Sequence, residues 1–388
     1  MAAVPLPRPG SEKLTRPDAG EVDLIARAIA TACAPPSGLT ELQRMMIEAL
    51  CPALTDHEVD VGHYVPVTPE EFAEGLRDRT LDFRTRGVQM MVLCALVLRP
   101  LPVAVADRIE RFAAALGVEE GMVRVAHRFA TGSLGLAAMD FERNGYTSHW
   151  HPDDARELHT SHELRTAWES CVTDDELAAR WAALGSLPEG SLGRGVWELY
   201  QARGFVFPGL PGSAPPLLAQ HDWVHVLGDF GTTVESEIEV FALIARANDD
   251  MRAFSLLAMV VSLFETGYLR TGAGLFEYDT GHISTLCHGR AMAVRLADAL
   301  RRGAWCHDAV TGSDSIDYLR LDWFSLAPLP VDEVRQRFGL RPKSPSAEAA
   351  GSVGPWSPGG ISPFQMKAGR ALAERDGRRY DSYGADVR

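Results

Sequence analysis

The sequence predicts an all-α protein with two helical domains and disordered N- and C-terminal tails. Apolar residues recur with a helical period through most of the chain, alternation typical of strands is scarce, and both ends are rich in Pro and polar residues. The length of 388 residues allows two or three domains at about 100–200 residues each. We divide the chain into a disordered arm (1–19), a helical domain (20–132), a hinge (133–173), a second helical domain (174–341) and a disordered tail (342–388).

Composition excludes several classes of protein. The net charge of −14 argues against a nucleic-acid-binding protein, which would carry a basic face. Six cysteines without a C-x-x-C pair indicate neither a zinc ribbon nor a disulfide scaffold. No secretory signal and no apolar stretch of about 20 residues is visible. We therefore expect a cytoplasmic protein that is at most peripheral to the inner face of the membrane.

The first domain has clear helix boundaries. Thr68 is a predicted N-cap, Pro69 occupies the first helical position, and Glu71 completes a capping box. Residues 83–98 and 102–116 read as a pair of helices separated at an Arg-Pro step. These signals predict a compact helical unit.

One stretch of this domain resembles a known family. Residues 76–118 read LRDRTLDFRTRGVQMMVLCALVLRPLPVAVADRIERFAAALGV, and their helix lengths and closing "AALGV" resemble the TerB-like helical domains of bacteria. Many members carry a metal-associated Asp-Gly motif between the paired helices. Here that junction reads LRPLPVA, so we expect no metal site in this domain.

The hinge is rich in histidine. It contains SHWHPDDARELHTSHE, with His149, His151, His159 and His162. Imidazole suits Zn²⁺, but no carboxylate or cysteine completes a recognised metal-binding spacing. We interpret this region as a solvated linker.

A His-Asp-x-x-His sequence in the second domain carries the sharpest chemical signal. His221 and His225 are four residues apart, so on a helix they lie on one face with Cβ atoms about 5–6 Å apart. That spacing lets two imidazoles share one cation. Asp222 lies between them in sequence. It could bind the same cation or orient one of the histidines by a hydrogen bond.

A carboxylate follows at a suitable position. Gly228 and Gly231 break the helix, and Thr232 or Thr233 restarts it as an N-cap. Glu237 then falls early in the new helix and shares a face with apolar residues, where a carboxylate is costly unless it meets a proton, a partner or a cation. Two histidines with one or two carboxylates suit Zn²⁺ and also the open sites of Fe²⁺.

Two other metal motifs fit less well. Metalloproteases of the H-E-x-x-H type use the middle Glu as a general base, whereas Asp222 stands here. Phosphohydrolases with an adjacent His-Asp pair have a compatible spacing, but they leave His225 and Glu237 without a role.

The motif consists of HDxxH, then eleven residues, then Glu. It resembles the signature of the Coq-four family of ubiquinone (coenzyme Q) biosynthesis. The flanking stretches LPEGSLGRGVWELYQARGFVFPG (187–209) and DYLRLDWFSLAPLPVDEVRQRFGL (317–340) also look like that family. The resemblance covers residues 174–341. It implies a divalent metal, Zn²⁺ with Fe²⁺ as the alternative, bound by His221, Asp222, His225 and Glu237.

The same resemblance implies a function and partners. The expected substrate is a prenylated hydroxybenzoate or quinone precursor, and the expected reaction is decarboxylation or oxidative decarboxylation by a lyase-type enzyme. Asp222 and Glu237 would be its catalytic residues, and other quinone-biosynthesis enzymes would be its protein partners.

Two alternative functions stay open at this point. The helix predicted at 250–267 is apolar nearly all round, which is typical of a core helix but also suits a prenyl-chain tunnel. The first alternative function is a non-catalytic scaffold that binds lipid and presents quinone intermediates to other enzymes. The third hypothesis is an envelope-stress protein whose function depends mainly on the first domain.

Overall fold

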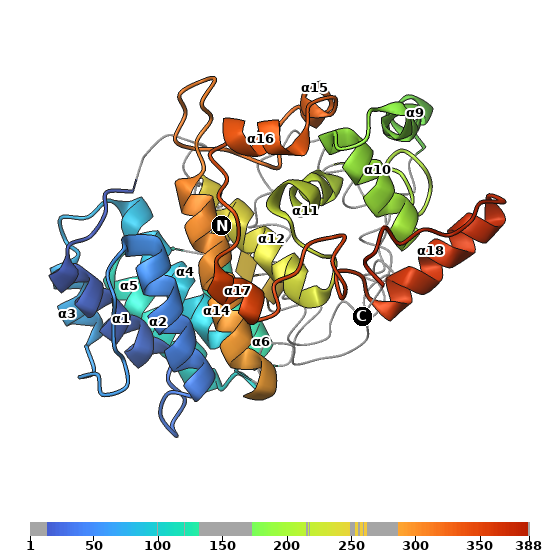
Figure 1. Ribbon diagram of the computed structural model, residues 1–388. Coiled ribbons are helices and arrows are strands. Elements are labelled where there is room, and N and C mark those ends of the chain that lie inside the picture. The colour runs from blue at the N-terminus through green and yellow to red at the C-terminus, as the bar shows by residue number, and fades with distance from the viewer. Residues whose placement is uncertain are drawn as a thin grey trace.

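All regular secondary structure in the described part of the chain is helical, which confirms the predicted all-α class (Figure 1). The computed structural model describes 14–131 except 99 and 120, 173–248 except 215 and 217, six residues between 253 and 261, and 286–386. Strand-like pairing over these ranges is limited to two isolated bridges. Among the helices described, none combines the length and hydropathy needed to cross a bilayer.

Six helices form the N-terminal part of the molecule, drawn in blue and cyan in Figure 1. They are α1 (Ala19–Cys33), α2 (Glu41–Thr55), α3 (Pro69–Gly75), α4 (Leu81–Ala95), α5 (Val103–Ala115) and α6 (Gly121–Ala130). The predicted capping box is present at α3, where the Glu71 amide donates to Thr68 Oγ1 and the Thr68 amide donates to Glu71 Oε2. The predicted helix pair corresponds to α4 and α5.

The remaining helices build the C-terminal two thirds of the described fold. They are α9 (Asp175–Ala183), η2 (Leu184–Ser186), α10 (Leu192–Arg203), η3 (Leu218–His221), α11 (Asp222–Gly228), α12 (Val234–Ala247), α14 (Leu286–Trp305), α15 (Trp323–Leu326), α16 (Val331–Arg337), α17 (Pro345–Ala349) and α18 (Pro363–Arg375). Helices α11 and α12 lie near the centre of the molecule (Figure 1).

Helix α14 connects the two predicted domains. It packs against α2 on one side and against α12 on the other (Figure 1). Gly303 of α14 lies so close to α12 that an added Cβ would be 2.5 Å from the Leu243 carbonyl oxygen. Most of the buried apolar residues form one cluster that runs from Val22 to Leu340, and a small second cluster holds Ala202, Ile361 and Ala385. The boundary between the domains stays a prediction, and the core is continuous across it.

The C-terminal tail is ordered where the structure describes it, so the prediction that it is disordered is wrong. Residues 342–386 contain α17 and α18, and α18 packs against α10. The contact is close, since a Cβ on Gly369 would be 2.0 Å from the Ala202 carbonyl oxygen, and Tyr380 donates its hydroxyl to the same carbonyl at 3.0 Å. Close packing of these two segments fixes the tail in place despite its Pro- and Gly-rich composition.

The arm at 1–19 is likewise ordered where the structure describes it. Arg16 pairs with Asp56, and Arg79 donates to the Thr15 carbonyl oxygen at 3.0 Å. Asp18 is the N-cap of α1. The expectation of disorder is therefore wrong for 14–19, while 1–13 lie outside the described residues.

Two other sequence-based predictions fall wholly or mainly outside the described residues. These are the hinge with its four histidines, apart from residue 173, and most of the helix expected at 250–267. The described residues of that helix include Phe254, Leu257, Ala258 and Val261, and they are helical and buried.

Candidate metal centre

The two motif histidines lie one helical turn apart, as their spacing predicts. The 3-10 helix η3 ends at His221 and runs directly into α11, which carries His225. Their ring centroids are 5.4 Å apart and their planes are inclined by 62°. Both side chains are buried, and His225 has no exposed surface at all.

Glu237 reaches the histidines from the next helix. Helix α11 ends at Gly228, and its C-cap Asp229 adopts the left-handed conformation with φ of 59°. Helix α12 then starts with Thr233 as its N-cap, one of the two predicted positions. Four residues after Glu237, the ring of Phe241 stacks on His221 with centroids 5.0 Å apart. The predicted shared face of Glu237 and Phe241 is thus the face that covers the histidines.

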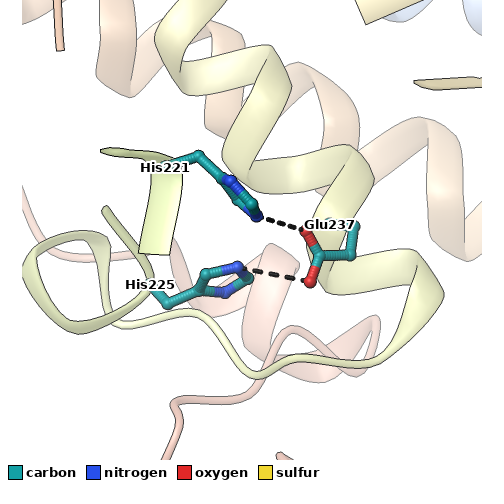
Figure 2. A group of neighbouring side chains, drawn as sticks. All are labelled: His221, His225 and Glu237. Carbon is teal, nitrogen blue, oxygen red and sulfur yellow. Dashed lines mark ion pairs between the residues drawn. The ribbon is translucent and has the colours of Figure 1, made fainter. Parts of the chain in front are cut away.

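Each oxygen of the Glu237 carboxylate faces one imidazole (Figure 2). Oε2 lies 3.3 Å from His221 Nε2, and Oε1 lies 3.3 Å from His225 Nε2. The three residues offer donor atoms that all lie within 4.8 Å of one another. In a tetrahedral site with bonds of about 2.0–2.1 Å, neighbouring donors are about 3.3 Å apart. The nitrogen–oxygen spacing therefore matches that of a shared cation.

The opposite ring nitrogens fix which tautomer each histidine adopts. His221 Nδ1 contacts the Leu218 carbonyl oxygen, and His225 Nδ1 lies 2.7 Å from the Gly231 carbonyl oxygen. Because a carbonyl oxygen only accepts, each Nδ1 carries the hydrogen and each neutral ring presents the Nε2 lone pair to Glu237.

A lone pair facing a carboxylate oxygen requires a positive species between them. His225 Nε2 is buried and makes no hydrogen bond to any described residue. Either a proton or a cation satisfies that atom, and two imidazoles with a carboxylate are the donor set of many Zn²⁺ and Fe²⁺ sites. The residues present thus fit a divalent cation.

The ionisable side chains of the site shift one another's pKa values. Burial opposes a charge on His221, but the Asp222 and Glu237 carboxylates outweigh it and raise the His221 pKa to about 9. Burial would also raise the pKa of Glu237, yet the two imidazoles lower that pKa to about 2. The site therefore holds its carboxylate ionised and attracts positive charge.

Asp222 lies beside the three-donor group and outside it. Its Oδ1 is 3.4 Å from His221 Nε2, and its Oδ2 accepts a 2.5 Å hydrogen bond from the Tyr200 hydroxyl. Burial raises the pKa of Asp222 although both histidines act to lower it. Burial and the nearby Asp222 carboxylate also raise the pKa of Tyr200 well above its usual value. This position suits a residue that orients His221 or exchanges a proton, and direct metal ligation by Asp222 stays a prediction.

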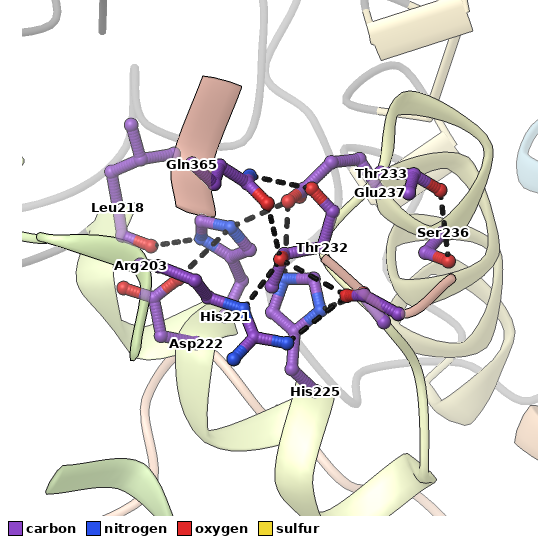
Figure 3. A network of polar contacts seen from close by, with 12 residues as sticks. Arg203, Leu218, His221, Asp222, His225, Thr232, Thr233, Ser236, Glu237 and Gln365 are labelled. Carbon is purple, nitrogen blue, oxygen red and sulfur yellow. Dashed lines mark hydrogen bonds and ion pairs between the residues drawn. The ribbon is translucent and has the colours of Figure 1, made fainter. Parts of the chain in front are cut away.

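The sequence analysis missed Arg203 and Gln365, which meet at Thr232 near the site (Figure 3). Arg203 donates from Nε to Thr232 Oγ1 at 2.6 Å, and Thr232 donates from Oγ1 to Gln365 Oε1 at 2.8 Å. All three are buried. Burial lowers the pKa of Arg203 to about 9 although nearby acidic groups act to raise it. Gln365 had a visible signal, since Ser362, Pro363 and Gln365 follow the capping-box pattern.

The fold and the site define an all-helical protein with a candidate mononuclear metal centre. No protein-family model and no curated protein matches the chain significantly. It is similar to a crystal structure of a Nostoc punctiforme PCC 73102 protein provisionally named a ubiquinone biosynthesis protein. That match covers 66% of this chain and 96% of the other, at 17% sequence identity and a TM-score of 0.30. With so low a TM-score, this likeness carries no functional argument.

Proposed function

We propose that this protein binds one divalent cation through His221, His225 and Glu237 and uses it in chemistry on an aromatic acid. Zn²⁺ is the expected ion and Fe²⁺ the alternative. The observation that carries the proposal is the pair of 3.3 Å contacts between the two Nε2 atoms and the two oxygens of one buried carboxylate.

The proposed substrate class rests on a sequence resemblance. An HDxxH motif followed after eleven residues by Glu is similar to the signature of the Coq-four family. We propose a prenylated hydroxybenzoate that loses its ring carboxylate as carbon dioxide while a proton takes its place on the ring carbon. When bound, the cation would act as a Lewis acid that stabilises negative charge on the ring oxygens. Other quinone-biosynthesis enzymes would supply the substrate and take up the product.

The chain's own residues supply the proton and its control. Asp222 is buried, its pKa is raised, and its Oδ2 accepts from Tyr200 at 2.5 Å. A carboxyl group with a raised pKa near a reacting ring is suited to deliver a proton to the vacated carbon. Tyr200 would hold Asp222 in one orientation, and Glu237 would keep both histidines in place.

The test follows carbon dioxide release and product mass after incubation of metal-loaded protein with a prenylated hydroxybenzoate. We expect release from the wild type, loss of release but not of metal in Asp222→Asn, and loss of both in His225→Ala. Parallel reactions with and without dioxygen and an electron donor distinguish simple from oxidative decarboxylation. Oxidative decarboxylation would leave a hydroxyl on the ring carbon, whereas simple decarboxylation would leave a hydrogen. Release that survives in both Asp222→Asn and Glu237→Gln would exclude this mechanism.

A cavity in the N-terminal part favours a second candidate function, lipid binding without turnover. Its walls are mainly apolar and include Ile25, Leu54, Phe83 and Met90. Arg86 also lines it, which would suit an apolar ligand with an acidic head. Tight binding of the prenylated acid with no carbon dioxide release, weakened by Met90→Glu, would favour this scaffold function over the enzyme.

A further inference from the structure

The C-terminal segment (residues 342–386) reaches the loop that joins the two helices of the metal centre. This loop runs from Asp229 to Thr233, between α11 and α12. The Gly231 amide donates to the Val353 carbonyl oxygen at 2.8 Å, and the Thr232 amide donates to the Gly360 carbonyl oxygen at 2.9 Å. We propose that residues 352–365 belong to the metal centre and position His225 for metal binding. This inference rests on the proposed function.

One peptide unit carries the connection. The carbonyl oxygen of Gly231 accepts from His225 Nδ1 at 2.7 Å. The N–H of the same peptide unit belongs to Thr232 and donates to Gly360. The imidazole, the peptide and the C-terminal segment therefore form one chain of hydrogen bonds, in which each bond polarises the next.

Buried side chains prevent this peptide from rotating. Gln365 Nε2 donates to the Thr232 carbonyl oxygen at 2.6 Å, while Gln365 Oε1 accepts from the Thr232 hydroxyl at 2.8 Å (Figure 3). Arg203 binds Thr232 Oγ1 through Nε and the Gly360 carbonyl oxygen through Nη2 at 3.0 Å. A turn of the peptide that released His225 would break several of these bonds at once.

Close backbone contact fixes the same junction sterically. A Cβ on Gly231 would lie 2.8 Å from the Gly360 Cα, and a Cβ on Gly360 would lie 2.2 Å from the Gly354 carbonyl oxygen. A Cβ on Gly354 would lie 2.1 Å from Asp229 Oδ1. Lys343 adds a 2.7 Å hydrogen bond to the Asp229 carbonyl oxygen. The segment thus fits the metal-site loop without space for adjustment.

Gln365 is consequently a positioning residue, because it acts on His225 only through the Gly231–Thr232 peptide. Residues that orient a metal ligand typically change metal affinity by about 10–100-fold when they are removed. The same is expected of Gln365, although it lies 140 residues from the histidine in sequence and its hydrogen bonds go to Thr232 and Ser362.

The chain offers a closely matched control in Gln43. Both glutamines are fully buried, both stand at the third position of a capping box, and both donate Nε2 to a backbone carbonyl of another segment. Gln43 lies in α2, in the N-terminal part of the fold. Gln365→Ala and Gln43→Ala therefore remove equivalent structural contacts and differ in their connection to the metal site.

The experiment titrates wild type, Gln365→Ala and Gln43→Ala with Co²⁺ and records visible absorption, which reports the geometry of the ligands. We expect Gln365→Ala to raise the dissociation constant about 10-fold or more and to change the spectrum. Gln43→Ala should keep the wild-type spectrum and bind within about twofold. Should Gln365→Ala fail to fold, Thr232→Val against Thr232→Ser makes the same test, because only Ser retains the hydroxyl.

The outcomes separate this inference from the proposed function. A wild-type spectrum and affinity in Gln365→Ala, or in Thr232→Val, would overturn the positioning role while leaving the metal site intact. Equal weakening by Gln365→Ala and Gln43→Ala would also overturn it, since that indicates a general loss of stability. A wild-type chain that takes up no Co²⁺ contradicts the proposed function itself, and the inference falls with it.

Discussion

His225 Nδ1 lies 2.7 Å from the carbonyl oxygen of Gly231, six residues further along the chain. This contact assigns the hydrogen to Nδ1 and leaves Nε2 facing Glu237 Oε1 at 3.3 Å. Helical spacing alone brings two imidazoles together, but it does not choose the nitrogen that faces inward. The loop between α11 and α12 makes that choice and thereby turns a pair of histidines into a candidate ligand set.

Alanine is expected to have opposite effects at two helical glycines, Gly303 at the contact between α14 and α12 and Gly87 in α4. At Gly303 an added Cβ would be 2.5 Å from the Leu243 carbonyl oxygen, whereas at Gly87 the nearest atom would be 3.8 Å away. Gly303→Ala should lower the free energy of unfolding by about 1–3 kcal/mol through overpacking. Gly87→Ala should raise it by up to about 1 kcal/mol through helix propensity. Urea denaturation measures both, and equal effects would contradict the assigned packing.

The continuous core predicts that the two halves of the chain unfold together. Helix α14 packs against α2 and α12, and the apolar cluster spans both predicted domains. Removal of the N-terminal helices would expose one face of α14. We expect a single calorimetric transition for the intact chain and aggregation of a chain that starts at residue 173. Two well-separated transitions, with a folded shorter chain, would instead support independent domains.

Asp317 predicts a pH dependence of stability. Burial raises its pKa to about 6, against opposing effects of the Leu319 amide and Arg320. Between about pH 6 and 4 the folded chain holds a proton that the unfolded chain lacks, so the contribution of this group to stability grows as the pH falls. Asp317→Asn removes the cost of the buried charge. It should stabilise the protein at pH 7 by about 1–2 kcal/mol, allowing for its partial exposure.

Urea denaturation of Asp317→Asn and wild type at pH 7 and pH 4 checks this assignment. The stability advantage of the variant should shrink toward zero at the lower pH, where the wild-type carboxyl becomes protonated. An advantage that is constant over this range, or a loss of stability at pH 7, would contradict the raised pKa.

Local sequence signals predicted the parts of the structure that depend on near neighbours. The capping box at Thr68 and the four-residue spacing of His221 and His225 both reflect one turn of helix, and both are found. Glu237 was identified because a carboxylate stood on an apolar face. Each of these inferences needed only a few consecutive turns of chain.

The errors arose where distant segments meet or where composition outweighed local signals. Tyr200, Arg203 and Gln365 reach the site from α10 and α18, and no local pattern indicates which carbonyl or carboxylate they will meet. The tail was expected to be disordered because of its Pro, Gly and Ser content. Yet Ser344 and Ser362 each precede a proline and cap a helix, which is the same signal that located α3.

Metal analysis of the purified protein tests the central claim most directly. The wild type should carry about one divalent ion per chain, with Zn²⁺ expected, because two Nε2 atoms and one carboxylate stand at the spacing of a shared cation. His225→Ala and Glu237→Ala should each lose the ion, while Gln43→Ala, altered far from the site, should retain it. Metal content that is unchanged in both His225→Ala and Glu237→Ala, or absent from a wild type reconstituted with Zn²⁺ and Fe²⁺, would contradict the account.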